Sequence, residues 1–443
     1  MRSTRLSLLV FAVFCALIAL PAVAPAAVHV KSLSTFGEFG KGAGQLSEPG
    51  GGEYAADGDY YVVDKGNDRI DVFGPDGKFK FTFGKGVNGE DQSDLCKAGE
   101  ECVPGVAGSK AGYLQAPEDL ALAAGKVYVT DPGNDRVAVF SEAGKFLYVF
   151  GGDVSEDGKD VYENDPCRAG KSGSALGELK DPSGIVAAPI TGGRGAEEIV
   201  VADKGNDRLA VYEISGRASF DSGLGVGGGS NFEICLKACR AGIGGPQAGS
   251  LDGPTSLSWG RFTGDLYVAS PVNNRVDLVY FGTEYAWSFG AGVGGEEIGV
   301  CNMQTGCQKG ASNFQAGSLP DPTGIVATES KEIYVADGQA NRVSKFDANG
   351  NFIRAWGMGV KDGSPKLQIC AATCRKGAQG TEAGAINAPT SLTTGPGGTL
   401  ALTETRGKLG SDLSRVQVLQ ETPAAESPKP GKKTPSSLFV SPF

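Results

Sequence analysis

Eight of the chain's 10 cysteines form four close pairs, and two nearby sulfurs either bind a metal or form a disulfide. The pairs have three or five residues between their sulfurs: Cys96/Cys102, Cys235/Cys239, Cys301/Cys307 and Cys370/Cys374. A zinc site needs four ligands, but the pairs recur at wide intervals and the only histidine is His29. In an exported chain the thiols oxidise. We therefore favour four local disulfides, each contributing about 2 kcal/mol, over zinc or reduced thiols.

Cys167 has no second cysteine in its part of the chain, so we expect it to remain outside the local disulfides or to pair with another molecule. The segment before it begins like a calcium-binding loop, with Asp153, Ser155 and Asp157 at positions 1, 3 and 5 and a glycine at position 6. An EF-hand has glutamate at position 12, where this chain has Asn164. Calcium is therefore the alternative to a solvated acidic loop.

Four carboxylates lie beside prolines that begin apolar segments, where they could bind a ligand or act as acids and bases. They are Glu48, Asp119, Asp181 and Asp321. Their positions relative to the proline differ, and the sequence contains no nucleophile elbow, paired-glutamate pattern or phosphate-binding loop. We predict a binding role for these four residues and no catalytic residue.

A long internal repeat positions all of these residues. The segment Tyr61-Val-Val-Asp-Lys-Gly-Asn-Asp-Arg69 recurs at intervals of 67 or 72 residues, and its sixth copy is degraded. The acidic position is Asp64, Asp131, Asp203, Asp337 and Glu404, with Ser270 in the fourth copy, and the basic position is Arg69, Arg136, Arg208, Arg275, Arg342 and Arg415. A residue type present in nearly every copy indicates architecture, with the carboxylate accepting bonds from turn amides or from the guanidinium.

Each repeat predicts four short strands. The first strand follows a proline, the second ends at the repeated Asp, the third begins at the repeated Arg, and the fourth ends in Phe-Gly or Trp-Gly. The turns between them contain Gly, Asn and Asp, which tolerate positive φ. Four-stranded sheets repeated radially are the blades of a propeller. The sequence therefore predicts an all-β fold with six antiparallel blades.

The repeats resemble the NHL repeat over Val28 to Gln420, and this resemblance implies a six-bladed β-propeller. The last copy lacks a fourth strand, and Lys31 to Gly37 matches that strand, so we expect the N-terminal strand to close the sixth blade. Related propellers include an amidating lyase with a zinc on several histidines and antibiotic lyases with a catalytic histidine, and the single His29 excludes both. Calcium-dependent lactonase-like or lyase-like propellers, with carboxylates at the channel mouth, are the alternative function.

The first 26 residues of the chain predict export. Residues 1–26 have the pattern of a secretory signal peptide, with Arg2 and Arg5 before an apolar stretch and an Ala-x-Ala site ending at Ala26. Residues 27–421 form the predicted propeller, and the Pro-, Ser- and Lys-containing tail 422–443 is predicted to be disordered. The net charge of −10, without a basic cluster, argues against nucleic-acid binding. We expect a secreted or cell-surface monomer without membrane insertion.

The repeat is longer than the 40 to 45 residues of a minimal blade, and the surplus lies in the linkers between blades. Because strands alternate in direction, these disulfide-bearing linkers and the Asp-to-Arg turns should lie on one face. Function usually resides on loops held by a rigid scaffold. We predict a binding or scaffold module, without a cofactor, that recognises a protein, glycan or small ligand through this face. Arg168, Arg240 and Arg375 are candidate contact residues.

Overall fold

The computed structural model describes residues 28–163, 166–188, 197–260, 263–280, 283–295, 299–405 and 413–423. Residues Val30 to Glu421 form one compact unit, which is described below. The predicted signal peptide (1–26), residues 424–443 of the predicted tail and Asn164 of the calcium-like loop lie outside the described residues. Within the described ranges, no helix is long and apolar enough to cross a membrane.

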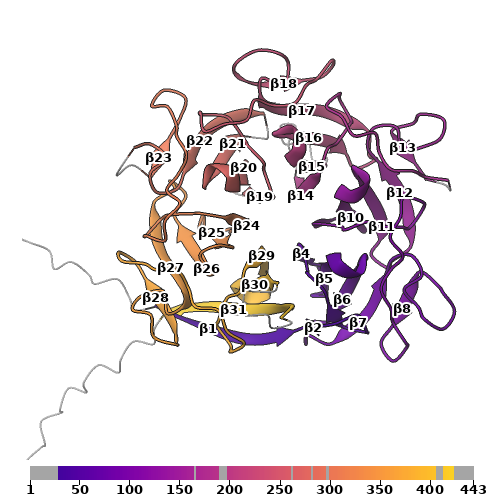
Figure 1. The fold of residues 1–443 in the computed structure, drawn as a ribbon, viewed down its shortest axis with the longest axis horizontal. Helices are drawn as coiled ribbons and strands as arrows, with labels where there is room; N and C mark the ends of the chain where they lie inside the picture. The colour runs from indigo at the N-terminus through magenta and orange to yellow at the C-terminus, as the bar shows by residue number, and fades with distance from the viewer. Residues whose placement is uncertain are drawn as a thin grey trace, which may run out of the picture. The chain divides into compact units, whose positions relative to one another are not determined.

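Six β-sheets are arranged radially around a common centre (Figure 1). From the centre outwards, blade 1 consists of β4 (Gly52–Tyr54), β5 (Tyr60–Asp64), β6 (Arg69–Phe73), β7 (Phe79–Phe83) and β8 (Leu95–Lys97). Blade 2 consists of β9 (Leu120–Ala123), β10 (Lys126–Asp131), β11 (Arg136–Ser141), β12 (Phe146–Phe150) and β13 (Val161–Tyr162). Blade 3 consists of β14 (Pro182–Ala188), β15 (Glu198–Asp203), β16 (Arg208–Glu213), β17 (Ala218–Leu224) and β18 (Phe232–Cys235).

The second half of the chain continues the same order. Blade 4 consists of β19 (Ser256–Gly260), β20 (Asp265–Ser270), β21 (Arg275–Tyr280), β22 (Glu284–Phe289) and β23 (Val300–Cys301). Blade 5 consists of β24 (Pro322–Ala327), β25 (Ile333–Asp337), β26 (Arg342–Phe346), β27 (Phe352–Met358) and β28 (Leu367–Cys370). Blade 6 consists of β29 (Pro389–Gly395), β30 (Thr399–Glu404), β31 (Arg415–Pro423) and β1 (Val28–Phe36).

Short elements connect the blade strands. The described residues include the 3₁₀ turns η1 (Lys65–Asn67), η2 (Pro132–Asn134), η3 (Lys204–Asn206), η4 (Pro271–Asn273) and η5 (Pro396–Gly398). The first four join the second and third strands of blades 1 to 4, where the repeated Gly or Asn residues lie. Between β1 and blade 1, β2 (Glu38–Phe39) and β3 (Gln45–Leu46) form a small parallel pair.

The N-terminal strand closes the propeller, as predicted. β1 is the outermost strand of blade 6 and lies beside β31 (Figure 1). At its end, the ring of Phe36 packs against Tyr60 and Phe73 of blade 1, with centroids 5.7 Å and 4.9 Å apart. The first strand of the chain therefore joins the last blade to the first, which leaves no open gap in the ring.

Blades 1 to 5 contain a fifth strand that the sequence analysis did not predict. After the fourth strand the linker turns back and pairs along it, as in the pairing of Thr82 with Cys96. In four of these blades the first cysteine lies in the fifth strand, and the second closes the turn that follows. All four predicted disulfides are present: Cys96–Cys102, Cys235–Cys239, Cys301–Cys307 and Cys370–Cys374. They hold the start of each long linker against its own blade.

The apolar core lies between the faces of neighbouring blades. One cluster combines Tyr61 and Phe83 of blade 1 with Leu120 and Val129 of blade 2, all of which are buried. Because strand side chains alternate between the two faces of a sheet, each blade supplies apolar residues to two such layers. Each blade is therefore stabilised by both neighbours, and burial of these layers is the main force that holds the ring together.

Hydrogen bonds also join the innermost strands into a continuous belt. In four blades the residue after the proline is Ser or Thr, and its hydroxyl donates to a carbonyl of the next blade: Ser183 to Thr255 (3.1 Å), Thr255 to Pro322 (3.4 Å), Thr323 to Pro389 (2.6 Å) and Thr390 to Pro49 (2.9 Å). Blade 1 is joined to blade 2 by the N–H of Gly51, which donates to Glu118. The hydroxyl of Thr130 joins blade 2 to Ser183 of blade 3.

Candidate functional site

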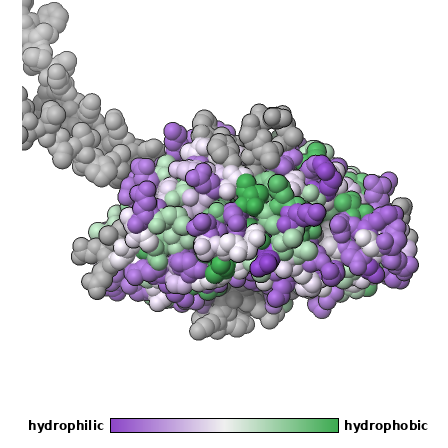
Figure 2. Space-filling view, turned by 90° about the horizontal axis from the view of Figure 1, so that it is seen from above, coloured by the Kyte–Doolittle hydropathy of each residue, from purple (hydrophilic) through white to green (hydrophobic). Residues whose placement is uncertain are grey.

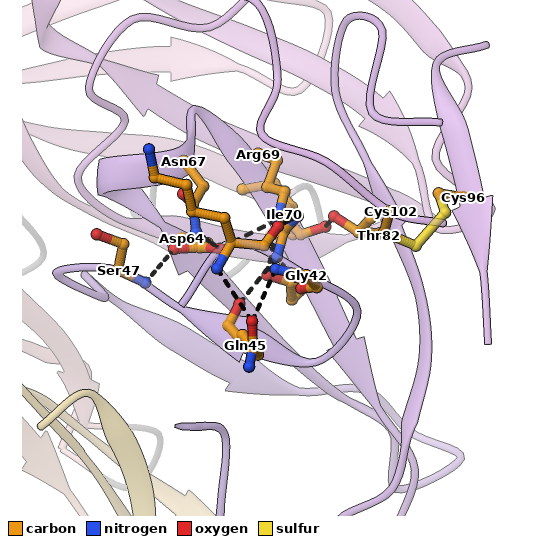
Figure 3. Close-up of polar contacts among 12 residues, drawn as sticks. Gly42, Gln45, Ser47, Asp64, Asn67, Arg69, Ile70, Thr82, Cys96 and Cys102 are labelled. Atoms are coloured by element: carbon orange, nitrogen blue, oxygen red, sulfur yellow. Dashed lines mark hydrogen bonds and ion pairs between the residues drawn. A yellow bond between two sulfur atoms is a disulfide. The ribbon is translucent and has the colours of Figure 1, made fainter. Parts of the chain in front are cut away.

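The repeated Asp-to-Arg turns surround buried arginines. In blade 1, Arg69 is fully buried, and its Nε donates to Oδ2 of Asp64 at 3.0 Å (Figure 3). Equivalent ion pairs are Asp131–Arg136, Asp203–Arg208 and Glu404–Arg415. In blade 4, where Ser270 replaces the acid, Arg275 instead pairs with Asp277 at 2.8 Å. In blade 5, the Oδ1 of Asp337 accepts the N–H of Ala340, and Arg342 donates to linker carbonyls.

Each buried arginine also binds the linkers that flank its blade. The guanidinium of Arg69 donates to the carbonyls of Gly42 and Gln45 in the preceding segment, both at 2.8 Å (Figure 3). It also donates to Val103, the residue after the second cysteine of the following linker, at 3.0 Å. The corresponding bonds in other blades run from Arg136 to Arg168, from Arg208 to Arg240 and from Arg342 to Arg375. The repeated arginines therefore fix the linkers to the blades.

A glycine three residues after the second cysteine position contacts the repeated turn. In blade 2, the N–H of Gly170 donates to Asn134 at 2.7 Å, and a Cβ at this position would lie 2.4 Å from the carbonyl oxygen of Asp135. The equivalent Cβ contacts, at Gly105, Gly242, Gly310 and Gly377, are between 2.1 and 2.3 Å. Such close approach of two backbones requires glycine. The linkers are thus ordered by the same repeat that orders the blades.

In blades 1, 2, 3 and 5, the residue before the repeated arginine links one blade to the next. Asp68 has a φ of 50°, and its Oδ1 accepts the N–H of Ala116 at the start of blade 2. The same bond recurs from Asp181 to Asp135, from Gly253 to Asp207 and from Ala388 to Asn341. Asp and Asn tolerate this left-handed conformation better than most residues, which explains their presence there. The repeated acid, the residue before the arginine and the arginine itself therefore all make contacts that stabilise the fold.

The three candidate arginines of the linkers lie in three different blades and are not brought together. Each follows the second cysteine position, and Arg240 and Arg375 are exposed. Arg168 is 43% exposed at its side chain and pairs with Asp153, the first residue of the calcium-like loop. Asp157 of that loop pairs with Lys159 at 2.7 Å. Two of the three candidate calcium ligands are therefore paired with cations, and no group of three or more potential metal ligands occurs among the described residues.

Two cavities lie end to end along the central channel. The larger, of about 750 Å³, is enclosed by the innermost strands and reaches the turns between the first and second strands of blades 5 and 6, at Ser330 and Gly397. The smaller, of about 310 Å³, reaches Glu48 and Lys65 on the linker side. A volume of 300 to 1,000 Å³ is usual for a small-molecule site. The larger cavity thus opens away from the linker face on which the sequence analysis had placed binding.

The four candidate carboxylates are distributed unevenly around these cavities. Asp119 lines both of them, and Glu48 lines the smaller one. Asp181 pairs with Lys204 at 2.9 Å and, like Asp321, is not among the lining residues. Measured from the proline, Glu48, Asp181 and Asp321 occupy the preceding position, whereas Asp119 is two residues after it. Of the four candidate carboxylates, only Asp119 therefore lines the larger cavity.

The two cavities meet at a ring that we call the waist, formed by the residues two positions after each proline. In blade order these are Gly51, Asp119, Gly184, Ser256, Gly324 and Ser391. The three polar members line both cavities. The glycines make room for them, since a Cβ on Gly51 would lie 1.6 Å from Oδ1 of Asp119. Glycine and polar residues alternate around the waist because neighbouring blades approach too closely for six side chains.

Side chains of the inner strands accept backbone bonds from the next blade. At the waist, Oδ2 of Asp119 accepts the N–H of Ile185 at 3.1 Å, and Oγ of Ser256 accepts the equivalent N–H of Ile325 at 3.3 Å. Asp119 and Ser256 therefore have the same structural role, one with a carboxylate and the other with a hydroxyl.

The same equivalence recurs two residues further along the strand. There, Oε2 of Glu53 accepts the N–H of Leu122 at 2.8 Å, and Oγ of Ser258 accepts that of Ala327 at 2.9 Å. Glu53 and Ser258 both line the larger cavity. The carboxylates thus lie in blades 1 and 2, and their serine equivalents lie in blade 4.

The larger cavity contains carboxylates in two electrostatic settings. At its rim, Lys345 lies 2.7 Å from Glu332 and from Glu421. Burial is the largest single influence and opposes ionisation of Glu332, but the bond and charge of Lys345, together with the hydroxyl bonds of Tyr334 and Ser330, outweigh it and lower the pKa of Glu332. At the waist, burial raises the pKa of Asp119 to about 7, although two backbone N–H bonds favour its ionised form. No Lys, Arg or His is among the described residues that line this cavity.

Sequence reasoning found Asp119 but missed Glu53, Ser256 and Ser391. A signal was present, because aligning the six repeats on their proline places Asp119 in the same position as Gly or Ser in every other blade. Glu53 likewise stands where the other blades have Ala, Val, Ser or Thr. A charged residue that occurs in one repeat alone indicates a function at that position, whereas the repeated Asp and Arg indicate a structural role.

The fold defines the chain as a six-bladed β-propeller, which confirms the prediction made from its NHL-type repeats. No protein-family model matches the chain. Among curated proteins, it is similar to Protein brain tumor of Drosophila melanogaster, with 30% identity over 129 residues, which is 28% of this chain and 10% of that protein. The match thus spans about a tenth of the relative's length.

Solved structures share the fold at low identity. Virginiamycin B lyase from Staphylococcus aureus is 10% identical, with a TM-score of 0.41, over 89% of this chain and 99% of that chain. A protein of unknown function from Bacteroides thetaiotaomicron is 13% identical, with a TM-score of 0.49, over 89% and 76% of the two chains. A nidogen/laminin complex contains a chain that is 14% identical, with a TM-score of 0.40, over 79% and 100%. These likenesses concern the fold alone.

Proposed function

We propose that this chain is a binding propeller that takes a small ligand into the larger cavity of its channel. The observation that supports this most strongly is the cavity of about 750 Å³ between the inner strands. It combines apolar walls, such as Leu257 and Ile325, with a few polar groups at the waist and aromatic residues Trp259 and Tyr334. That combination is typical of small-molecule sites. The four disulfides fit an oxidising compartment, in line with an extracellular or cell-surface role.

A cavity-filling variant tests this proposal. Thr393 lines the larger cavity, and Thr393→Trp would fill part of it. Thr381→Trp is the matched control, because Thr381 is exposed in the linker before blade 6. Equilibrium dialysis against a mixed small-molecule library, read by mass spectrometry, should find ligands that wild type and Thr381→Trp retain and that Thr393→Trp loses. Equal retention by both variants would refute the channel as the binding site.

A second candidate function is the docking of a partner protein on the linkers. Of the large apolar side chains that are exposed among the described residues, most lie in linkers or Asp-to-Arg turns: Val106, Ile234, Leu236, Ile243, Val272 and Met303. Figure 2, which looks onto one edge of the propeller, shows hydrophobic residues gathered among hydrophilic ones. Contiguous apolar patches are typical of interaction sites, and three of these residues, Ile234, Leu236 and Ile243, belong to one linker. Charge reversal at Arg240 and Arg375 should weaken such docking, whereas reversal at Lys145 should not.

A further inference from the structure

We propose that the outer edge of blade 6 binds an extended segment of a partner protein, which adds to β1 as a fifth strand. This inference goes beyond the proposed function, because it concerns the rim of the propeller and not the channel. β1 is the outermost strand of blade 6, and no described strand pairs with its outer side (Figure 1). Each of the other five blades ends in a fifth strand. Among the described residues, blade 6 thus presents an open sheet edge, which is a template for another strand.

The linker that follows β1 is too short to supply a fifth strand. From Phe36 the chain reaches the proline of the next blade at Pro49, whereas from Phe83 it reaches the corresponding proline only at Pro117. The additional residues of the longer linkers contain the fifth strands and, in four blades, the disulfides. A strand that covers β1 must therefore come from outside this linker.

β1 has few of the features that usually protect an edge strand. Native edges are kept very short, bulged, or occupied by prolines and several charges. The fifth strands of the other blades have two to four residues, whereas β1 has nine. Between Val30 and Phe36 its only charged residue is Lys31, it contains no proline, and Leu33 is 45% exposed. A long edge with little charge favours the addition of a strand.

The exposure of Phe36 shows where a fifth strand is missing. Phe36 is equivalent to Phe83, because each packs against a glycine turn of the next blade. A Cβ on Gly77 would lie 3.2 Å from the ring of Phe36, and a Cβ on Gly144 would lie 2.7 Å from Phe83. In blades with a fifth strand, the aromatic residues at this position are fully buried: Phe83, Phe150, Phe289 and Trp356. Phe36 is only partly buried, so it lacks the cover that a fifth strand provides.

The existing fifth strands define the chemistry of the segment that fits. All run antiparallel to the fourth strand, and the residue paired with the position equivalent to Phe36 is aliphatic in every case: Leu95, Val161, Ile234, Val300 and Ile369. Four of these residues pack against the core between their own blade and the next, and in blade 3 Phe232 does so instead. Among the described residues, the core between blades 6 and 1 has no such member. We therefore expect a Leu, Ile or Val opposite Phe36.

The same antiparallel register predicts the rest of the segment. After the aliphatic residue opposite Phe36, the next two residues lie opposite Thr35 and Ser34, which are exposed and polar. The fourth residue lies opposite the exposed Leu33, which favours a second aliphatic side chain. The sixth lies opposite Lys31, which favours an acidic residue, because directly opposed charges of opposite sign stabilise a sheet. The expected pattern is aliphatic, polar, polar, aliphatic, polar and acidic.

A partner segment fits this edge better than a second copy of the propeller. Two copies joined through β1 would share Val30 to Phe36 of each copy, whereas stable interfaces have roughly 20–30 residues a side. An added peptide strand obtains its affinity from main-chain bonds and its specificity from alternate side chains, so a short contact is sufficient. The edge is therefore suited to an extended segment of a different protein.

The test uses the full chain and fluorescence anisotropy with the peptide fluorescein-Ser-Leu-Thr-Thr-Val-Thr-Glu-amide, which has the expected pattern. We expect saturable binding that becomes about tenfold weaker when the Leu of the peptide is replaced by Ser, since its burial against Phe36 is lost. Lys31→Glu should weaken binding about fivefold, and a peptide with Lys in place of its Glu should restore it. Lys145→Glu is the matched control, because Lys145 is exposed in a turn of blade 2.

A second pair of peptides tests the main-chain bonds. Each is N-methylated at alternate residues, one at the odd and the other at the even positions. Successive N–H groups of a strand point to opposite sides, so only one of the two sets faces β1. We expect one peptide to lose binding and the other to bind like the parent peptide.

Four outcomes would overturn the inference. Absence of binding, or equal binding of the two N-methylated peptides, would exclude strand addition. If the peptide binds only after Leu438→Ser and Val440→Ser, which lie outside the described residues, the chain itself covers the edge. If the chain sediments as a dimer that Leu33→Lys dissociates, the edge belongs to a second copy. All four outcomes leave the channel proposal standing, because no residue of β1 lines the larger cavity.

Discussion

Removal of one buried arginine should loosen two linkers at once. Arg136 is fully buried, pairs with Asp131 at 3.0 Å and donates to four linker carbonyls, those of Ser109, Lys110, Tyr113 and Arg168. Arg136→Met preserves much of the side-chain volume but leaves Asp131 and these carbonyls without their donor. Breaking a buried ion pair on one side costs about 3–5 kcal/mol. Because the carbonyl bonds add to that loss without being additive, we expect at least about 4 kcal/mol of destabilisation.

Arg168→Met is the matched control, since Arg168 lies in one of the same linkers. Its ion pair with Asp153 joins side chains that are 43% and 37% exposed, and exposed pairs contribute about 0–1 kcal/mol. Urea unfolding followed by tryptophan fluorescence and by circular dichroism should separate the two variants clearly, and coincidence of the two probes would show that unfolding is two-state. Hydrogen exchange should also show lost protection on both sides of blade 2 in Arg136→Met. Similar free energies of unfolding for the two variants would refute the structural role given to the repeated arginines.

Three further predictions follow from particular contacts. Thr390→Val removes the hydroxyl bond between blades 6 and 1 and should lower the free energy of unfolding by about 1 kcal/mol, measured by urea titration; no change would mean that the inner belt adds nothing to closure. Gly170→Ala places a Cβ 2.4 Å from the carbonyl oxygen of Asp135 and should lower the free energy of unfolding by about 1–3 kcal/mol. Gly125→Ala is the control for backbone strain alone, because a Cβ at Gly125 would have no atom within 4 Å but the residue has a φ of +71°. Asp119 has a pKa of about 7 when folded and about 4 when unfolded, so its contribution to stability is lost as pH rises through that window. The melting temperature of Asp119→Asn should therefore rise relative to wild type between pH 4 and 7, and a constant difference would contradict the raised pKa.

Much of the fold was predictable because each of the six copies of the sequence repeat identifies one blade. The spacing of Asp64, Arg69 and their equivalents defines the blades, and the match of Lys31 to Gly37 with a fourth strand predicted the closure. The disulfides followed from the spacing of cysteines within one linker. These features are local or repeat in register, so they are visible without knowledge of three-dimensional contacts.

The fifth strands and the cavity were less accessible to sequence reasoning. β8 is only three residues long and too short to show alternation of apolar and polar residues. The role of Asp119 depends on Gly51 and Ile185, which belong to other blades and approach it only in the closed ring. The pairing of Arg168 with Asp153 was also hidden, because the two residues are separated by a loop whose path the sequence does not specify. Contacts between residues that are far apart in the sequence could thus be found only from the structure.

The most direct test of the central claim is a crystal structure of the full chain soaked with bromine-labelled small-molecule fragments, in which the anomalous signal of bromine locates each bound ligand. The account predicts bromine peaks inside the larger cavity, between the inner strands β19 and β24. Bromine peaks on the linkers alone, with the larger cavity empty of ligand, would contradict the account.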